Sequence, residues 1–280
     1  MTDKPSRRAR VQPILVKVPE ITLIFWVLKL LTTGMGEAMS DFLGQNSVPL
    51  AAAVGFFGLV LALWLQLRQP RYSPAYYWFA VMMVAVFGTM AADAIHDGTG
   101  VGYSVTAPAF ALIVAVIFLL WYRTEGTLSI HSIDTRRREC FYWSAVLGTF
   151  ALGTAAGDLT AYQLNLGFWT SALLFGAIIA IPAIAWSRRW MNPVVAFWFA
   201  YIVTRPLGAS FADGFSKPTN GGLGLGDGTV SAIALAVFIA LVGYVCRSER
   251  NGRVTAARHR RYHAPHLELD VREPQAASAD

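Results

Sequence analysis

The sequence predicts an all-α polytopic membrane protein with about eight transmembrane helices in four parallel two-helix repeats. Three observations predict this class: an apolar composition, basic residues confined to alternate connections, and a fourfold internal repeat. Apolar residues make up 55% of the 280 residues and charged residues 14%, against about 25% charged residues in soluble domains. The charges crowd the two tails and a few short connections, so long stretches between them carry none.

Eight apolar segments are long enough to cross a bilayer, which takes about 20 residues of helix. They cover residues 20–43, 48–67, 75–95, 103–122, 140–160, 164–186, 193–215 and 228–246. We therefore expect a single transmembrane domain over residues 20–247, with repeats at about 20–67, 75–122, 140–186 and 193–246. A basic cytoplasmic segment over residues 1–19 precedes it, and a polar, disordered cytoplasmic tail over residues 248–280 follows it.

Basic residues lie in both tails and in every second connection between the predicted helices. They are Lys4, Arg7, Arg8, Arg10, Lys17, Arg68, Arg71, Arg123, Arg136, Arg137, Arg138, Arg188, Arg189, Arg247, Arg250 and Arg253. The opposite connections hold only Lys217. Because cytoplasmic connections are rich in Lys and Arg, this pattern predicts a membrane protein with an even number of spans and both termini in the cytoplasm. The net charge of +6 is explained in the same way, so we expect a lipid bilayer and a small ion or solute as partners, and no nucleic acid. The oligomeric state stays open.

Four copies of one pattern run through the chain, at periods of 52, 65 and 55 residues. Each copy has a Trp preceded by Phe or Tyr, a Gly ten residues later and an Asp fifteen residues later. The tryptophans are Trp26, Trp78, Trp143 and Trp198. The glycines are Gly36, Gly88, Gly153 and Gly208. The aspartates are Asp41, Asp93, Asp158 and Asp213.

Each position of this pattern has a physical interpretation. Tryptophan favours the membrane interface, glycine lets helices approach closely, and fifteen residues of helix place the Asp about 22 Å from the Trp, near the outer helix end. Two helices per copy give all four copies the same orientation, unlike the inverted repeats of many transporters. The copies should form a pseudo-fourfold ring, or two pseudo-twofold pairs, about an axis along the membrane normal.

The segments that carry the pattern resemble a known family. These segments are VPEITLIFWVLKLLTTGMGEAMSD, YWFAVMMVAVFGTMAADAIHD, YWSAVLGTFALGTAAGD and FWFAYIVTRPLGASFADGFSKP. They are similar to a bacterial integral membrane family defined by a fourfold repeat of unknown function, over roughly residues 15–247. The resemblance implies a multi-pass protein of a bacterial cytoplasmic (inner) membrane and supplies no activity.

Three charged residues interrupt the predicted helices. Lys29 lies about 12 Å and Arg205 about 16 Å from the start of its helix, and Glu37 lies between Lys29 and the first repeat Asp. A charge at bilayer depth costs about 2.5–3.5 kcal/mol on insertion scales and therefore usually faces the bundle interior with a partner. We expect Glu37 to pair with Arg205 and Lys29 to find a partner on another helix. The alternatives are a snorkelling Lys29 or a purely structural ion pair.

The repeat aspartates are candidate cation ligands. An acid near a helix C-terminus faces the negative end of the helix dipole, and carboxylate-rich sites suit Mg²⁺, Ca²⁺ and Mn²⁺. We therefore predict metal ligands at Glu37, Asp41, Asp93, Asp158 and Asp213. A solvated helix end is the alternative. Secondary candidates on the same helix faces or the outer side are Thr33, Thr89, Thr154, Asp97 and Tyr201. No cofactor is identified beyond a bound divalent cation.

Two features of the last repeat also bear on a polar path. Pro206 removes a backbone hydrogen bond from the carbonyl of Ile202, which predicts either an interruption of its helix beside a membrane cavity or a tolerated kink. The glycine-rich stretch that follows Asp213 is expected to be a flexible outer gate or a plain linker. Asp227 is expected to cap the last helix.

These residues favour a transporter of a small polar solute, through a charged path lined by the first, third, fifth and seventh predicted helices. Acids outnumber bases on that path, so a cation is the expected substrate, and a divalent metal ion is the narrower expectation. Lys29 and Arg205 can equally mark an anion path. A metal-dependent or acid–base intramembrane enzyme and a scaffold or regulatory subunit are the alternatives. No catalytic residue is predicted, because no nucleophile–base constellation or nucleotide motif is present.

Overall fold

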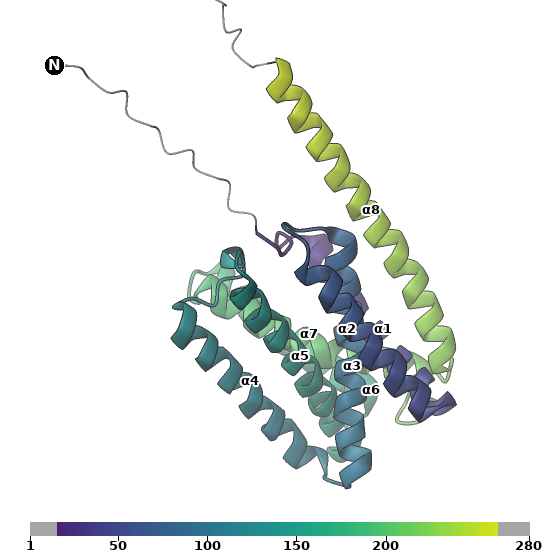
Figure 1. The fold of residues 1–280 in the computed structure, drawn as a ribbon. Helices are drawn as coiled ribbons and strands as arrows, with labels where there is room; N and C mark the ends of the chain where they lie inside the picture. The colour runs from purple at the N-terminus through teal and green to yellow at the C-terminus, as the bar shows by residue number, and fades with distance from the viewer. Residues whose placement is uncertain (1–15, 263–280) are drawn as a thin grey trace, which may run out of the picture.

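The structure, a computed structural model, describes residues 16–262 and confirms the all-α class (Figure 1). Its eight long helices are α1 (Leu23–Asn46), α2 (Val48–Leu67), α3 (Pro74–Thr99), α4 (Tyr103–Glu125), α5 (Arg136–Asp158), α6 (Gly167–Ser187), α7 (Pro193–Ser216) and α8 (Asp227–Tyr262). A 3₁₀ turn, Ile130–Ser132, precedes α5, and a π-helical turn, Leu159–Gln163, continues it. The described residues contain no strand.

Local sequence signals set the helix boundaries. Four helices begin behind a polar cap whose side chain accepts a hydrogen bond from a backbone N–H in the first turn. The caps are Thr22, Ser47, Thr135 and Asn192. Helices α3 and α4 end at Gly100 and Gly126, each with a φ of 69°, a conformation that glycine adopts without strain.

Helix α8 runs past the predicted end at residue 246, as far as Tyr262. No proline interrupts the chain between residue 247 and Pro265, so the helix can continue into the segment that we expected to be a polar tail. Residues 263–280 of that tail, and residues 1–15 of the basic N-terminal segment, lie outside the described residues.

Six of the eight helices in the described region are long and apolar enough to span a bilayer on their own: α2, α3, α4, α6, α7 and α8 as far as Asn251. The other two differ for visible reasons. Helix α1 contains Lys29, Glu37 and Asp41, and α5 is rich in Gly, Ala and Thr. Large apolar side chains are exposed on the outer helices, among them Phe57, Leu112, Leu173 and Ile239. Apolar surface of this extent belongs in lipid, so the chain is a multi-pass membrane protein.

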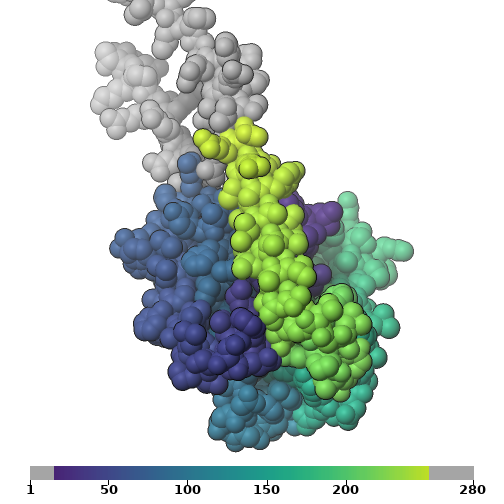
Figure 2. Space-filling view, turned by 90° about the vertical axis from the view of Figure 1, so that its right-hand side faces the viewer, coloured from purple at the N-terminus to yellow at the C-terminus, as the bar shows by residue number. Residues whose placement is uncertain are grey.

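The four odd-numbered helices form a closed inner ring. Helix α1 packs on α3, α3 on α5, α5 on α7, and α7 back on α1. The even-numbered helices lie outside, and each packs mainly on the odd helix of the next repeat: α2 on α3, α4 on α5, α6 on α7 and α8 on α1. Figure 2 shows α8 along the outside of the bundle, beside the purple residues of α1. Of the two predicted arrangements, the molecule therefore adopts the fourfold ring.

The repeat glycines make this ring possible. A Cβ added to each would collide with the neighbouring inner helix. The side chains met are Ala85 for Gly36, Phe150 for Gly88, Arg205 for Gly153 and Thr33 for Gly208. One glycine therefore lies at each of the four contacts of the ring, as expected for small residues at close helix contacts.

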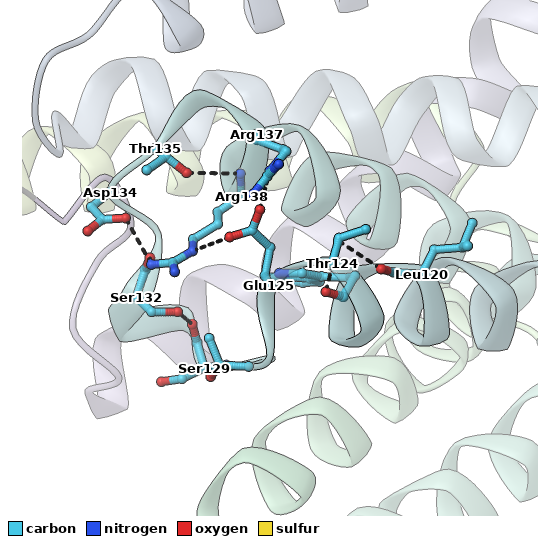
Figure 3. A network of polar contacts seen from close by, with 11 residues as sticks. Leu120, Thr124, Glu125, Ser129, Ser132, Asp134, Thr135, Arg137 and Arg138 are labelled. Carbon is cyan, nitrogen blue, oxygen red and sulfur yellow. Dashed lines mark hydrogen bonds and ion pairs between the residues drawn. The ribbon is translucent and has the colours of Figure 1, made fainter.

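Polar networks fix the helix connections at the end of the bundle where the repeat tryptophans lie. Arg137 and Arg138 both donate to Glu125, with Arg138 Nε 2.7 Å from Oε2, and Arg138 also donates to Asp134 at 3.1 Å (Figure 3). These contacts fasten the connection between α4 and α5. A second pair, Lys17 and Glu139, is buried with Nζ 2.6 Å from Oε2 and ties the segment before α1 to α5.

Candidate cation site

The inner ring is built in layers that follow the helical repeat. Residues four apart stack on one helix face, so steps of four from each repeat Asp define successive layers. The first layer holds Asp41, Asp93, Asp158 and Asp213, and the second holds Glu37, Thr89, Thr154 and Ala209. The third layer holds Thr33, Ala85, Phe150 and Arg205, and the fourth holds Lys29, Val81, Val146 and Tyr201. The fifth layer holds Phe25, Tyr77, Tyr142 and Phe197. Every residue of the second to fifth layers is buried.

The first layer opens into a cavity of about 400 Å³ at one end of the ring. Its walls contain all four repeat aspartates and Glu37. The other lining residues are His96, Asp97, Tyr103, Tyr162 and Lys217. The four carboxylates thus converge on one space, an arrangement that the repeat alone could not establish.

Three of the carboxylates lie close enough to share one ion. Oxygens of Glu37, Asp41 and Asp213 are all within 4.8 Å of one another. Two oxygens on opposite sides of one Ca²⁺ ion are about 4.6–5.2 Å apart, because each binds at about 2.3–2.6 Å. These three fit a divalent cation. Asp93 and Asp158 line the same cavity but do not belong to this close group, so the predicted set of five ligands divides into three and two.

Two carboxylates of the cavity are buried without a partner. Asp213 is 4% exposed and Asp158 is 7% exposed, and neither side chain has a hydrogen bond or ion pair with any described residue. Burying a carboxylate is costly unless a cation or donors compensate it. The cavity therefore holds two carboxyl groups that make no hydrogen bond or ion pair with the described residues, as ligands of a bound cation would.

Among the described residues, Lys217 is the one lysine or arginine that lines the cavity. Its Nζ is 2.5 Å from Asp41 Oδ2 and 3.0 Å from Asp227 Oδ2, and Gln45 Nε2 is 2.8 Å from the same Asp227 oxygen. The Asp227 carboxylate accepts from these side chains, so its role differs from the predicted helix cap. Burial lowers the pKa of Lys217, but the carboxylates of Asp41 and Asp213 raise the pKa more, so that it lies above its ordinary value and the ammonium stays charged.

Beneath the cavity, Arg205 and Glu37 form its floor. Arg205 is fully buried, and its Nη2 is 2.7 Å from Glu37 Oε2, so the predicted ion pair is confirmed. The same nitrogen donates to Thr89 and, at 2.7 Å, to Thr154, while Nη1 donates to the carbonyl of Thr33 at 3.2 Å. The guanidinium therefore binds to all three other helices of the ring. Helix α7 continues across Pro206, so the predicted interruption is absent.

Lys29 lies one layer deeper than Arg205 and has no carboxylate partner. Its buried Nζ makes no hydrogen bond with the described residues and lies 4.1 Å from the ring centroids of both Phe150 and Tyr201. This is cation–π geometry. The partners of Lys29 therefore do lie on other helices, as expected, but among the described residues they are aromatic rings and not carboxylates, and the side chain does not snorkel. Lys29 and Tyr201 lie apart from the cavity, below its floor.

Aromatic rings close the other end of the inner ring. Phe25 and Phe197 lie with centroids 6.1 Å apart, and the hydroxyl oxygens of Tyr77 and Tyr142 are 2.5 Å apart. Together they form the fifth layer. Three buried layers, the second to the fourth, thus separate the aspartates of the first layer from this end of the bundle.

Sequence reasoning missed four residues of the site. The four are Tyr103, Tyr162, Lys217 and Asp227. Only Lys217 gave a signal, as the single base in the outer connections. The His96 ring stacks on Tyr103 at 3.9 Å, and its Nδ1 is 2.8 Å from the carbonyl oxygen of Val101, which places both rings at the rim.

Fold and site together define a polytopic helical membrane protein in which four repeats close around an acidic cavity. The chain matches the family model described as Repeat of Unknown Function (DUF347) at residues 24–72, 76–127, 141–190 and 196–251. It belongs to that family, and the four matched ranges correspond to the four repeats found in the sequence. No curated protein and no solved structure matches the chain.

Proposed function

We propose that this protein transports a small cation across the membrane, a divalent metal ion in the narrower form of the proposal, and that the acidic cavity is its binding site. The convergence of four repeat aspartates and Glu37 on one cavity carries the proposal. The close group of Glu37, Asp41 and Asp213 offers the hard oxygen ligands that such ions prefer.

The surroundings of the two buried bases favour a cation over an anion. Arg205 is engaged by Glu37, two threonine hydroxyls and a backbone carbonyl, so little of it is free for an anion. Lys29 is enclosed between two aromatic rings. Neither base reaches the cavity walls, where the carboxylates lie.

In the proposed orientation the cavity opens on the outer face of a bacterial cytoplasmic membrane, with both termini in the cytoplasm. The placement of the basic residues supports this orientation, because Arg68, Arg123 and Arg188 all lie at the end of the bundle away from the cavity. The structure then corresponds to an outward-open state. Transport requires the Arg205–Glu37 floor and the aromatic fifth layer to open in turn, as alternating access demands.

Flux in liposomes tests the proposal. Purified protein is reconstituted with an internal dye that Mn²⁺ quenches, and wild type is compared with the double variant Asp158→Asn/Asp213→Asn. Both aspartates lack structural partners, so the fold should tolerate the change. Flux should fall about tenfold or more, because ligand charge sets the affinity of such sites.

Glu20→Gln is the matched control, since Glu20 is exposed and lies near the end of the bundle away from the cavity. Its flux should equal that of wild type. Equal flux in wild type and the double variant overturns the proposal. Tight Mn²⁺ binding without any flux would instead support a metal-dependent enzyme, and the absence of both would support a scaffold.

A further inference from the structure

Lys217 holds one of the carboxylates that the proposed cation needs. Asp41 belongs to the close group with Glu37 and Asp213, yet its Oδ2 is 2.5 Å from the Lys217 ammonium. A cation bound at the group and the ammonium would therefore compete for the same carboxylate. The Lys217 ammonium thus supplies positive charge to Asp41 at the edge of the site, where a bound cation would otherwise supply it.

Asp213, another carboxylate of the close group, has no ion pair among the described residues while Lys217 binds Asp41. The Asp213 side chain is 4% exposed, lines the cavity and has no hydrogen bond or ion pair among the described residues. The ammonium of Lys217 thus pairs with Asp41 and leaves Asp213 without a direct ion pair among the described residues. The site accommodates more positive charge than its own lysine supplies.

The backbone of Lys217 is held in place, so only its side chain can move. Its N–H donates to the carbonyl of Asp213 at 2.9 Å, and its carbonyl accepts from Gly224 at 3.0 Å. Further backbone bonds run from Leu223, Leu225 and Gly226 back to the end of α7. The stretch that we expected to be a gate or linker is thus hydrogen-bonded to α7, and the lysine extends from a fixed anchor.

Asp227 gives the ammonium a second place to bind. Its Oδ2 already accepts from Lys217 at 3.0 Å and from Gln45 at 2.8 Å, and its Oδ1 is buried without a hydrogen bond. If the Lys217 ammonium leaves Asp41, it therefore keeps its contact with Asp227 Oδ2 and can also bind Asp227 Oδ1.

We propose that Lys217 is a built-in competitor of the transported cation, which displaces the ammonium from Asp41 onto Asp227 when it binds. This inference rests on the proposed function, because it concerns the same site. The return of Lys217 to Asp41 lowers the affinity of the site and assists release of the cation. Between transport cycles such a competitor keeps a counter-charge on Asp41, while Asp213 has no ion pair among the described residues.

Binding of Mn²⁺ to the purified full chain in detergent tests this inference, with free Mn²⁺ measured by electron paramagnetic resonance. Lys217→Met should bind Mn²⁺ about fivefold more tightly or better, which is the order of one partly buried ion pair. Lys217→Arg, which keeps the charge, is the matched control and should stay within about twofold of wild type on the same scale.

Lys217→Met is also measured in protein that carries Asp41→Asn. This comparison separates competition for Asp41 from a general effect of removing a positive charge. If Lys217 acts by competing for Asp41, Lys217→Met should give no gain in affinity when Asp41 is already replaced. An equal gain with and without Asp41 overturns the inference, as does unchanged affinity in Lys217→Met.

The same titrations keep the two proposals apart. Wild-type binding that is lost in Asp158→Asn/Asp213→Asn, together with unchanged affinity in Lys217→Met, overturns the competitor and leaves the cation site standing. Binding seen only after Lys217→Met supports the competitor strongly. Absence of binding in both wild type and Lys217→Met overturns the competitor and the divalent-cation site together.

Discussion

The two halves of the inner ring use the same repeat in chemically different ways. On α1 and α7, the inward positions hold Glu37 and Arg205 as an ion pair at 2.7 Å. On α3 and α5, the positions that correspond to Glu37 hold Thr89 and Thr154, and in the fifth layer Tyr77 and Tyr142 form a hydrogen bond at 2.5 Å. An ion pair therefore joins α1 to α7, and a hydrogen bond between neutral hydroxyls joins α3 to α5.

This difference also places the proposed cation site off the axis of the ring. All three close carboxylates, Glu37, Asp41 and Asp213, come from α1 and α7, whereas the aspartates of α3 and α5 only line the cavity wall. A fourfold repeat makes a symmetric cavity possible, but divergence within the repeat concentrates binding at one helix pair. Variants in matched positions of the two halves can test this view.

The largest effect is expected for Glu37→Gln, which removes the carboxylate partner of Arg205. The guanidinium would stay buried without its counter-charge, and breaking a buried pair in this way costs about 3–5 kcal/mol. The free energy of unfolding, measured in mixed micelles titrated with dodecyl sulfate, should fall by that amount.

Asp93→Asn, on the hydroxyl-bearing half, is the control for this variant, because Asp93 has no ion pair among the described residues. It should destabilise far less. The double variant Glu37→Gln/Arg205→Met should recover most of the loss, since both buried charges are then gone. Equal losses for Glu37→Gln and Asp93→Asn would contradict the comparison.

A smaller effect is expected where α7 meets α1. In Gly208→Ala the new methyl group would collide with Thr33 and lie 3.1 Å from the backbone nitrogen of Gly34, and overpacking of this kind costs about 1–3 kcal/mol. In Gly157→Ala, on α5, the nearest atom would be 3.7 Å away, so that variant should be neutral or slightly stabilising. The same unfolding titration measures both, and equal destabilisation of the two would show that the α1–α7 contact is not unusually close.

The smallest effect is expected on the hydroxyl-bearing half. Tyr77→Phe removes the hydrogen bond to Tyr142, and a bond of this kind contributes about 0.5–1.5 kcal/mol. The double variant Tyr77→Phe/Tyr142→Phe should lose no more than the single variant, because no buried hydroxyl is then left unpaired. If Tyr77→Phe destabilised as much as Glu37→Gln, charge would not distinguish the two halves.

Much of the architecture was predictable because it depends on local pattern. Apolar run lengths defined eight helices, and only α8 extended well past its predicted end, where no proline stops it. The Trp-to-Asp spacing set the two ends of each inner helix, and the Glu37–Arg205 pair followed from the cost of burying single charges. Lys29 was predicted less well, because aromatic faces can replace a carboxylate as a partner.

The sequence by itself determined the fourfold repeat, the helices and the ends at which the acids lie. Only the tertiary structure decided that each outer helix packs on the next repeat, that the four aspartates share one cavity, and that Lys217 binds Asp41. Periodicity fixes which residues share a face of one helix. It does not fix how far apart two helices pack or which side chains meet across them, and Lys217 and Asp41 meet across 176 residues of chain.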